Sequence, residues 1–250
     1  METALIETDH KDLSNWTNLH RTLQGIKLQY SAPVRNRLPV TISILRTLKN
    51  ALRYSQSLIP VDQLMMWSAF TIAFFGFLRV SEFTAQSPTN FNEPTTMVRS
   101  DIHFDQSLNS LNITIKSSKT DPFRRGQNII VAASGSSVCA VRAYLRYTSV
   151  ALHPTQSPAF QFMDGSFLTR QRITFELQRL LARAGFYNTS QYTSHSFWSG
   201  AATTAAAAGI PDWLIKCLGR WQSDAYQVYI KTPIATLQEV PSIIAKHSGK

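Results

Sequence analysis

Residues 194–231 contain side-chain types that can carry out acid–base and nucleophilic chemistry. The segment reads SHSFWSGAATTAAAAGIPDWLIKCLGRWQSDAYQVYIK. It places His195 at an expected helix start, Arg220 directly after a Leu-Gly pair, and Tyr229 nine residues after Arg220. Histidine moves protons, arginine stabilises oxyanions, and tyrosine can act as a nucleophile. Cleavage of a phosphodiester without a metal needs these parts: a nucleophile, cations over the non-bridging oxygens, an acid for the leaving oxygen and a base.

The sequence has no pattern typical of metal or nucleotide chemistry. None of its six histidines is paired with cysteine or carboxylate at ligand spacing. No GxxxxGK[ST] phosphate loop occurs, and the glycines are placed for turns and helix ends. We therefore expect neither a metal nor a nucleotide cofactor.

Residues 194–231 resemble the C-terminal signature of tyrosine recombinases, the enzymes that cut and rejoin DNA through a phosphotyrosine. Residues 75–83, FGFLRVSEF, resemble the first box of that family, in which a glutamate follows an arginine by three positions. The pattern GRW-x-SDAY-x-x-Y at residues 219–229 is similar to eukaryotic transposon recombinases of the DIRS/Crypton-like type. The resemblance covers roughly residues 40–232 and implies DNA recombination or integration, as in a transposable element. The strand cleavage and rejoining that it implies are metal-independent and pass through a 3′-phosphotyrosyl intermediate.

The two boxes imply roles for individual residues. By this match Arg79 clamps the scissile phosphate, and Glu82 is a structural or orienting carboxylate. His195 contacts the phosphate and shuttles a proton. Tyr229 is the candidate nucleophile, and Tyr226, three residues earlier on the same helical face, is the alternative.

A lysine-containing hairpin adds a candidate acid. In the family, a lysine between the second and third strands donates a proton to the leaving 5′-oxygen. Lys119 matches that position best, and Lys116 is the alternative. The neighbouring Arg124 and Arg125 are expected to contact the DNA backbone, which carries no sequence information.

One position departs from the family pattern. The family reads His-x-x-Arg, whereas here Trp198 stands three residues after His195. Tryptophan is uncharged and offers a single N–H donor. Loss of one preorganised oxyanion donor lowers a rate by about 10²–10³-fold, so we expect impaired cleavage. Arg220, at the offset of the auxiliary phosphate donor, is hypothesised to replace part of the missing cation. The alternative is a catalytically inactive, domesticated DNA-binding module of the same fold.

The composition favours a polyanionic partner. The 250 residues carry a net charge of +10, and four acidic residues lie in the first twelve positions. The rest of the chain therefore holds 24 basic and 11 acidic side chains, which indicates nucleic acid as the partner. The two cysteines form no disulfide framework, and the N-terminus lacks a signal-peptide layout. We expect an intracellular protein, in the nucleus or wherever DNA is accessible.

The hydrophobic patterns predict a mainly helical α+β fold with a small three-stranded antiparallel sheet. The apolar run at residues 64–78 is too short for a membrane span and indicates a buried core helix. Residues 99–132 alternate as a three-stranded meander, and Asp164-Gly165 marks a hairpin at residues 160–168. Ile44, Leu45, Leu48 and Leu52 should face inward on the first helix, and Val138, Val141 and Leu145 on a later one. The expected helices are 41–54, 61–83, from Ser136 or Ser137 to Tyr147, 169–184, 195–208 and 211–219, followed by a last helical turn with Tyr226 and Tyr229.

Two domains are expected. Residues 1–38 comprise an acidic tail, a remnant helix of an N-terminal DNA-clamp domain, and a linker rich in proline and arginine. Residues 39–250 form the tyrosine recombinase catalytic domain. By analogy with the family, the partner is double-stranded DNA, with a homotetramer on DNA and residues 239–247 as a docking helix.

Overall fold

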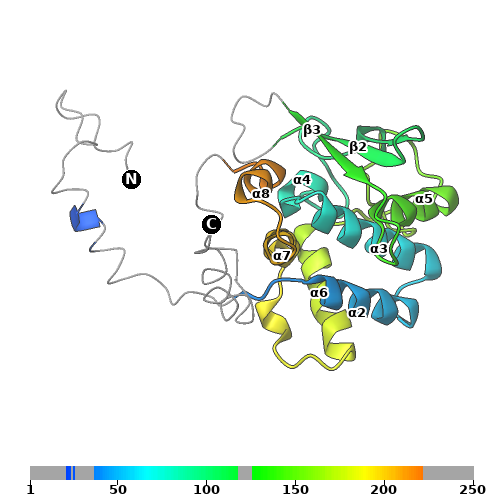
Figure 1. Ribbon diagram of the computed structural model, residues 1–250. Coiled ribbons are helices and arrows are strands. Elements are labelled where there is room, and N and C mark those ends of the chain that lie inside the picture. The colour runs from blue at the N-terminus through cyan, green and yellow to red at the C-terminus, as the bar shows by residue number, and fades with distance from the viewer. Residues whose placement is uncertain (1–20, 24, 26–36, 118–125, 222–250) are drawn as a thin grey trace, which may run out of the picture. The chain divides into compact units, whose positions relative to one another are not determined.

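The computed structural model describes residues 21–23, 25, 37–117 and 126–221 of the chain. The chain divides into two units, Met1–Asn36 and Arg37–Lys250, and the elements below belong to the second (Figure 1). Residues 21–23 and 25, within the helix expected in residues 13–38, are helical. The rest of that expected helix, the turn with Tyr226 and Tyr229, and the docking helix at 239–247 lie outside the described residues.

The second unit is mainly helical with one small sheet, as the sequence predicts (Figure 1). Its helices surround α3, which is buried along most of its length. The elements are α2 (Ile42–Arg53), α3 (Pro60–Phe75), α4 (Val80–Phe83), the 3₁₀ turn η3 (Arg99–Asp101), β1 (Ile102–Asp105), β2 (Ser110–Ile115), β3 (Gln127–Ala132), α5 (Ala140–Val150), α6 (Arg170–Arg183), the 3₁₀ turn η4 (Thr189–Gln191), α7 (His195–Ala207) and α8 (Asp212–Gly219).

The sheet is the predicted antiparallel meander, with strand order β1-β2-β3. Its register places Ile113 opposite Ile102 on one side and Ile129 on the other. Leu111, Ile113 and Ile115 alternate along β2 and are buried, so one face of the sheet packs on the core.

The prediction of one helix over residues 61–83 is wrong in its length. The helix ends at Phe75, and a separate short helix follows after a break in the helical backbone. Phe77 has a φ of 48°, a left-handed conformation that interrupts a helix. A side chain at Gly76 would place its Cβ 2.8 Å from the carbonyl oxygen of Ile72. The break ends α3 and starts α4 at Arg79, which is the N-cap residue of α4.

The helix expected from Ser136 or Ser137 also begins later, with Cys139 as its N-cap. Leu145, expected on its inward face, is 36% exposed, whereas Tyr144 and Tyr147 are buried. The two tyrosines face the core because their hydroxyl groups reach backbone carbonyls, at 3.4 Å from Tyr144 to Arg99 and at 3.2 Å from Tyr147 to Gln161.

The remaining elements agree with the sequence within about two residues. Thr169 caps α6 by accepting from the N–H of Arg172. An antiparallel bridge joins Gln161 to Phe167 around the turn at Gly165, as the hairpin prediction requires. None of the described helices combines the length and the apolar character required to cross a membrane.

Candidate active site

A buried carboxylate joins two of the candidate arginines. Glu82 is 2% exposed, and its Oε1 lies 3.1 Å from Nη1 of Arg79. Its Oε2 lies 2.7 Å from Nη2 of Arg220 and accepts a hydrogen bond from the backbone N–H of Arg79 at 2.9 Å. One carboxylate therefore fixes the guanidinium groups of residues 141 positions apart in the sequence.

The terminal guanidinium nitrogens of Arg220 donate their hydrogen bonds to acceptors within the protein. Its guanidinium donates to the carbonyl oxygens of Gly76 at 3.2 Å, Phe77 at 2.7 Å and Leu218 at 3.2 Å. Burial lowers the pKa of this guanidinium, while the Glu82 charge opposes that shift. Only Nε has no acceptor among the described residues. The contacts give Arg220 a structural role, which ties α8 to the break between α3 and α4.

His195 begins α7 beside Trp198. The two ring centroids are 4.8 Å apart, and the Trp198 ring lies 4.4 Å from that of Trp221. Trp198 is 3% exposed, and the Arg79 guanidinium carbon lies 5.7 Å from its ring centroid. Trp198 is therefore an integral part of this cluster of side chains rather than a surface residue.

Gly219 makes room for this aromatic group. A Cβ at Gly219 would lie 1.9 Å from the Trp221 ring. Arg220 has a φ of 55°, so the chain turns sharply at the end of α8 and brings Trp221 back over Gly219. The Leu-Gly-Arg-Trp corner thus has a packing function in addition to any chemical one.

Positive charge converges on His195. Burial, together with the charges of Arg37, Arg79 and Arg170, lowers the pKa of His195 to about 4. The imidazole lies at the N-terminal end of α7, where the helix dipole is positive and no acidic residue occupies the first turn. The histidine is therefore neutral near pH 7 and lies in a field that attracts anions.

Arg37 and Arg170 are site candidates that the sequence interpretation missed. The segment that carries Arg37 is tied to α7 because Val40 donates its N–H to the carbonyl of Ser196 at 2.9 Å. Arg170 is brought near α4 because Ala85 donates its N–H to the carbonyl of Leu168 at 2.9 Å.

A signal for Arg170 was present in the sequence. It is the first residue of α6, where a cation is disfavoured by the helix dipole, and the first turn contains no acid. Arg172, in the same turn, pairs with Glu176 at 3.0 Å, whereas Arg170 has no carboxylate partner in the described part of the chain.

The structure describes one of the two candidate lysines, Lys116. Nζ of Lys116 lies 2.9 Å from the Asp101 carboxylate and 3.2 Å from the carbonyl oxygen of Glu93. Lys116 is therefore held in an ion pair at the base of the hairpin. Lys119, Arg124, Arg125, Tyr226 and Tyr229 lie outside the described residues.

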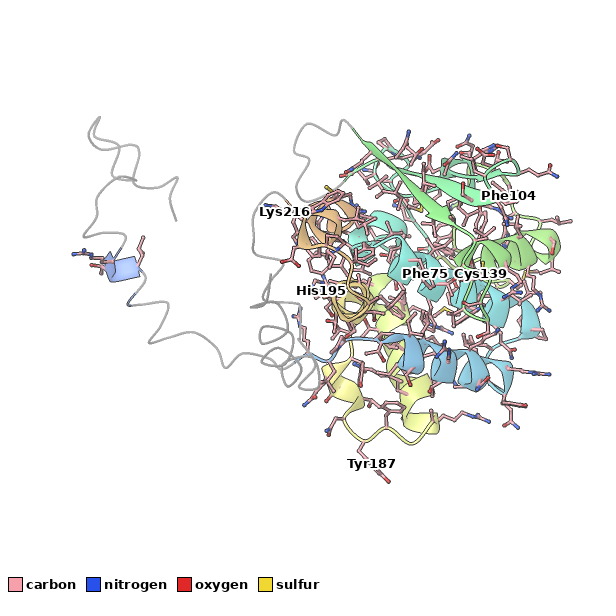
Figure 2. All side chains as sticks on the ribbon, viewed as in Figure 1. Phe75, Phe104, Cys139, Tyr187, His195 and Lys216 are labelled. Carbon is pink, nitrogen blue, oxygen red and sulfur yellow. The ribbon has the colours of Figure 1, made fainter. Side chains whose placement is uncertain are left out.

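The described side chains can bind an oxyanion but do not by themselves complete a reaction. Arg79, Arg170 and Arg37 supply charge, and His195 supplies a group for proton transfer. Figure 2 shows His195 at the N-terminal end of α7, on the side of the unit where α8 lies. Among the described residues no group of three or more His, Cys, Asp or Glu side chains is arranged to hold a metal ion.

Comparison with solved structures identifies the architecture. The XerH site-specific recombinase, bound to its palindromic difH substrate, superposes with a TM-score of 0.59 at 16% identity, over 84% of this chain and 54% of that one. XerA recombinase gives a TM-score of 0.59 at 14% identity, over 96% and 79% of the two chains. The chain has the fold of a tyrosine recombinase catalytic domain. The Tn1549 transposon integrase, in complex with circular intermediate DNA, shares this fold with a TM-score of 0.52 at 12% identity, over 81% and 63% of the chains.

The likeness is one of fold rather than of sequence. No protein-family model and no curated protein matches this sequence. The chain spans about half the length of the XerH recombinase chain. The roles of single residues in this recombinase fold must therefore be argued from its own side chains.

Proposed function

We propose that this protein binds double-stranded DNA at His195 and the three arginines whose charges act on it, Arg37, Arg79 and Arg170, here called the His195 cluster, and acts in recombination or integration. The observation that carries this proposal is the convergence of Arg37, Arg79 and Arg170 on His195 within a recombinase fold. The charges are close enough to depress the pKa of a neutral imidazole, and a phosphate group would relieve their mutual repulsion. The GRW-x-SDAY-x-x-Y pattern further points to an origin in a DIRS/Crypton-like transposable element.

The proposed reaction is a metal-independent phosphoryl transfer. The Tyr229 hydroxyl oxygen attacks the scissile phosphorus and releases its proton to the neutral imidazole of His195. The P–O5′ bond breaks, Lys119 protonates the departing 5′-oxygen, and the DNA remains attached through a 3′-phosphotyrosyl bond. Attack by another 5′-hydroxyl reverses these transfers and rejoins a strand. Arg79 stabilises the charge on the non-bridging oxygens.

We expect Trp198 to lower the rate of this cleavage reaction. The position contributes a buried indole in contact with His195 instead of a second guanidinium. Arg220 does not supply the missing charge in full, because both of its terminal nitrogens already donate to protein acceptors. These two observations favour the second candidate function, a DNA-binding module that does not cut.

A suicide-substrate experiment tests the two candidates. A pool of nicked duplexes with randomised sequence around the nick is incubated with the full chain, and covalent adducts are resolved on a denaturing gel. An adduct that Tyr229→Phe removes and Tyr226→Phe retains supports the enzyme. Salt-dependent binding with no adduct supports the module. Absence of binding to every duplex at low salt would overturn both and leave an interaction scaffold.

A further inference from the structure

A second basic site lies away from His195. A cavity of about 760 Å³ is lined by residues of α2, α3 and α5. Figure 1 shows α5 and α8 on different sides of the unit, and Figure 2 shows the labelled Cys139, which lines this cavity, apart from His195. The lining contains five basic side chains and no carboxylate: Arg46, Lys49, Arg53, Arg142 and Arg146. We call this cavity the α2–α5 groove.

The basic residues form two facing rows because of helix periodicity. Arg46, Lys49 and Arg53 recur at i, i+3 and i+7 on one side of α2, next to the face that buries Leu45, Leu48 and Leu52. Arg142 and Arg146 lie one turn apart on α5. Leu64 and Trp67 of α3 also line the groove, as do the polar Asn50 and Gln63, so its lining combines basic, polar and apolar side chains.

Within the described part of the chain, no carboxylate neutralises the charges in the groove. None of the five basic side chains has a salt bridge to a carboxylate within residues 37–117 and 126–221. Lys49 donates instead to the carbonyl of Ser137 at 2.6 Å and lies over the Trp67 ring at 5.7 Å. Desolvation lowers the pKa of Lys49, and the charges of Arg142, Arg146 and Arg53 lower it further. Like charges are therefore gathered in one concave surface, where an anionic ligand would relieve their repulsion.

The shape of the rows favours a chain of phosphates over a single anion. Arg46 and Arg53 are seven residues apart, which is about 10 Å along a helix. That length is enough to contact more than one phosphate of a DNA strand. The guanidinium fork also matches the oxygens of a phosphate better than an ammonium group does.

We propose that the α2–α5 groove binds the phosphate backbone of a second nucleic-acid segment, separate from the segment bound at His195. The site goes beyond the proposed function, since it uses no residue of the His195 cluster. Two segments held by one chain would be brought together before any strand exchange. Backbone contacts of this type position DNA without reading its sequence.

The salt dependence of DNA binding tests the groove. Fluorescence anisotropy with a 30-base-pair duplex of mixed sequence is measured from low to moderate salt for the full chain and for the triple variant Arg46→Gln/Arg53→Gln/Arg146→Gln. Each lost phosphate contact reduces the slope of log K against log salt by about 0.9, so the triple variant should lose about 2–3 from the slope and about tenfold or more in affinity. The three residues line the surface rather than the core, and thermal unfolding checks that the fold is kept.

A matched pair of single variants controls for charge. Arg53 and Arg183 are each the basic residue in the last turn of their helix, in α2 and in α6. Arg53→Gln should reduce the slope by about 0.9, whereas Arg183→Gln, outside the groove, should leave it unchanged. Equal effects of the two variants would overturn the proposal.

Two further results would overturn it and separate it from the proposed function. A triple variant with the slope of the unmodified chain would show that the groove does not hold DNA. Loss of binding to a deoxynucleoside triphosphate or to polyglutamate, with duplex binding unchanged, would assign the groove to another anion. The absence of a covalent adduct would count against the proposed cleavage but would leave these binding measurements unaffected.

Discussion

Glu82 and Arg220 form an ion pair of 2.7 Å in which both side chains are almost fully buried. The pair links the start of α4 to the end of α8, two segments that carry different boxes of the sequence signature. Because Glu82 also holds Arg79, the geometry of Arg79 depends on the residue that caps the last described helix.

Removal of one member of this pair should strongly destabilise the fold. Arg220→Ala leaves the Glu82 carboxylate buried beside a single arginine, and loss of one partner of a buried pair costs about 3–5 kcal/mol. Urea denaturation measures the free energy of unfolding. Arg183→Ala, an exposed arginine at a helix end, is the control and should change it by less than about 0.5 kcal/mol.

A double-mutant cycle separates the pair from the rest of the packing. Glu82→Gln and Arg220→Ala together should destabilise less than the sum of the single changes, because the second change removes the charge that the first left unpaired. Additive effects would show that Arg220 acts through its contacts with the carbonyls of Gly76 and Phe77 alone.

Trp198→Arg should raise DNA cleavage. The change places a guanidinium one helical turn from His195, and a restored charge-stabilising donor is worth about tenfold or more in rate. The covalent adduct on nicked duplexes measures the effect. Trp198→Phe is the control, since it keeps an aromatic ring without adding charge and should give no increase. A folded Trp198→Arg variant with unchanged adduct would show that the missing arginine is not the main defect.

His195 should make stability fall in mild acid. Its pKa is about 4 in the folded chain against 6.5 for a free histidine. Between these values the unfolded state binds more protons, so the free energy of unfolding decreases as the pH falls from about 6.5 towards 4, by on the order of 2–4 kcal/mol. Urea denaturation at several pH values should show a shallower decline for His195→Gln. If the free energy of unfolding fell with pH equally in the unmodified chain and in His195→Gln, the imidazole would not be buried and neutral.

Arg170→Gln should shift this titration. Loss of one of the three cations that repel the protonated imidazole raises the pKa of His195. The ring resonances of His195, followed by NMR against pH, measure the shift. Arg183→Gln, at the other end of the same helix, should leave it unchanged. If Arg170→Gln has no effect, Arg170 does not belong to the anion-attracting cluster.

The helical framework could be read from the sequence because local signals agree with the packing. Thr169 and the glycines at 185 and 209 mark helix ends by their side chain or by positive φ values. The break after Phe75 could not be read, because the apolar pattern continues through it while the interruption depends on the conformation of Phe77. Tertiary contacts alone fix such a position.

The candidate site was only partly predictable for a similar reason. The spacing of Arg79 to Glu82 and of His195 to Trp198 is local, so motifs reveal it. Arg37 and Arg170 reach the same histidine through backbone contacts between distant segments, and no local pattern encodes this proximity. The hydrogen bonds that hold the Arg220 side chain likewise go to carbonyl groups about 140 positions earlier in the chain, which no local pattern predicts.

Gly200 should tolerate no side chain. A Cβ there would lie 1.9 Å from the carbonyl oxygen of Val40, in the segment that brings Arg37 to α7, so backbone would have to move. Gly200→Ala should therefore destabilise the fold by more than about 3 kcal/mol and weaken DNA binding. Ala207→Ser, which adds one heavy atom to an exposed position of α7, is the control and should change stability by less than about 0.5 kcal/mol. Thermal unfolding and duplex binding measure both effects. A Gly200→Ala protein of normal stability and affinity would show that the contact between residues 38–40 and α7 does not position Arg37.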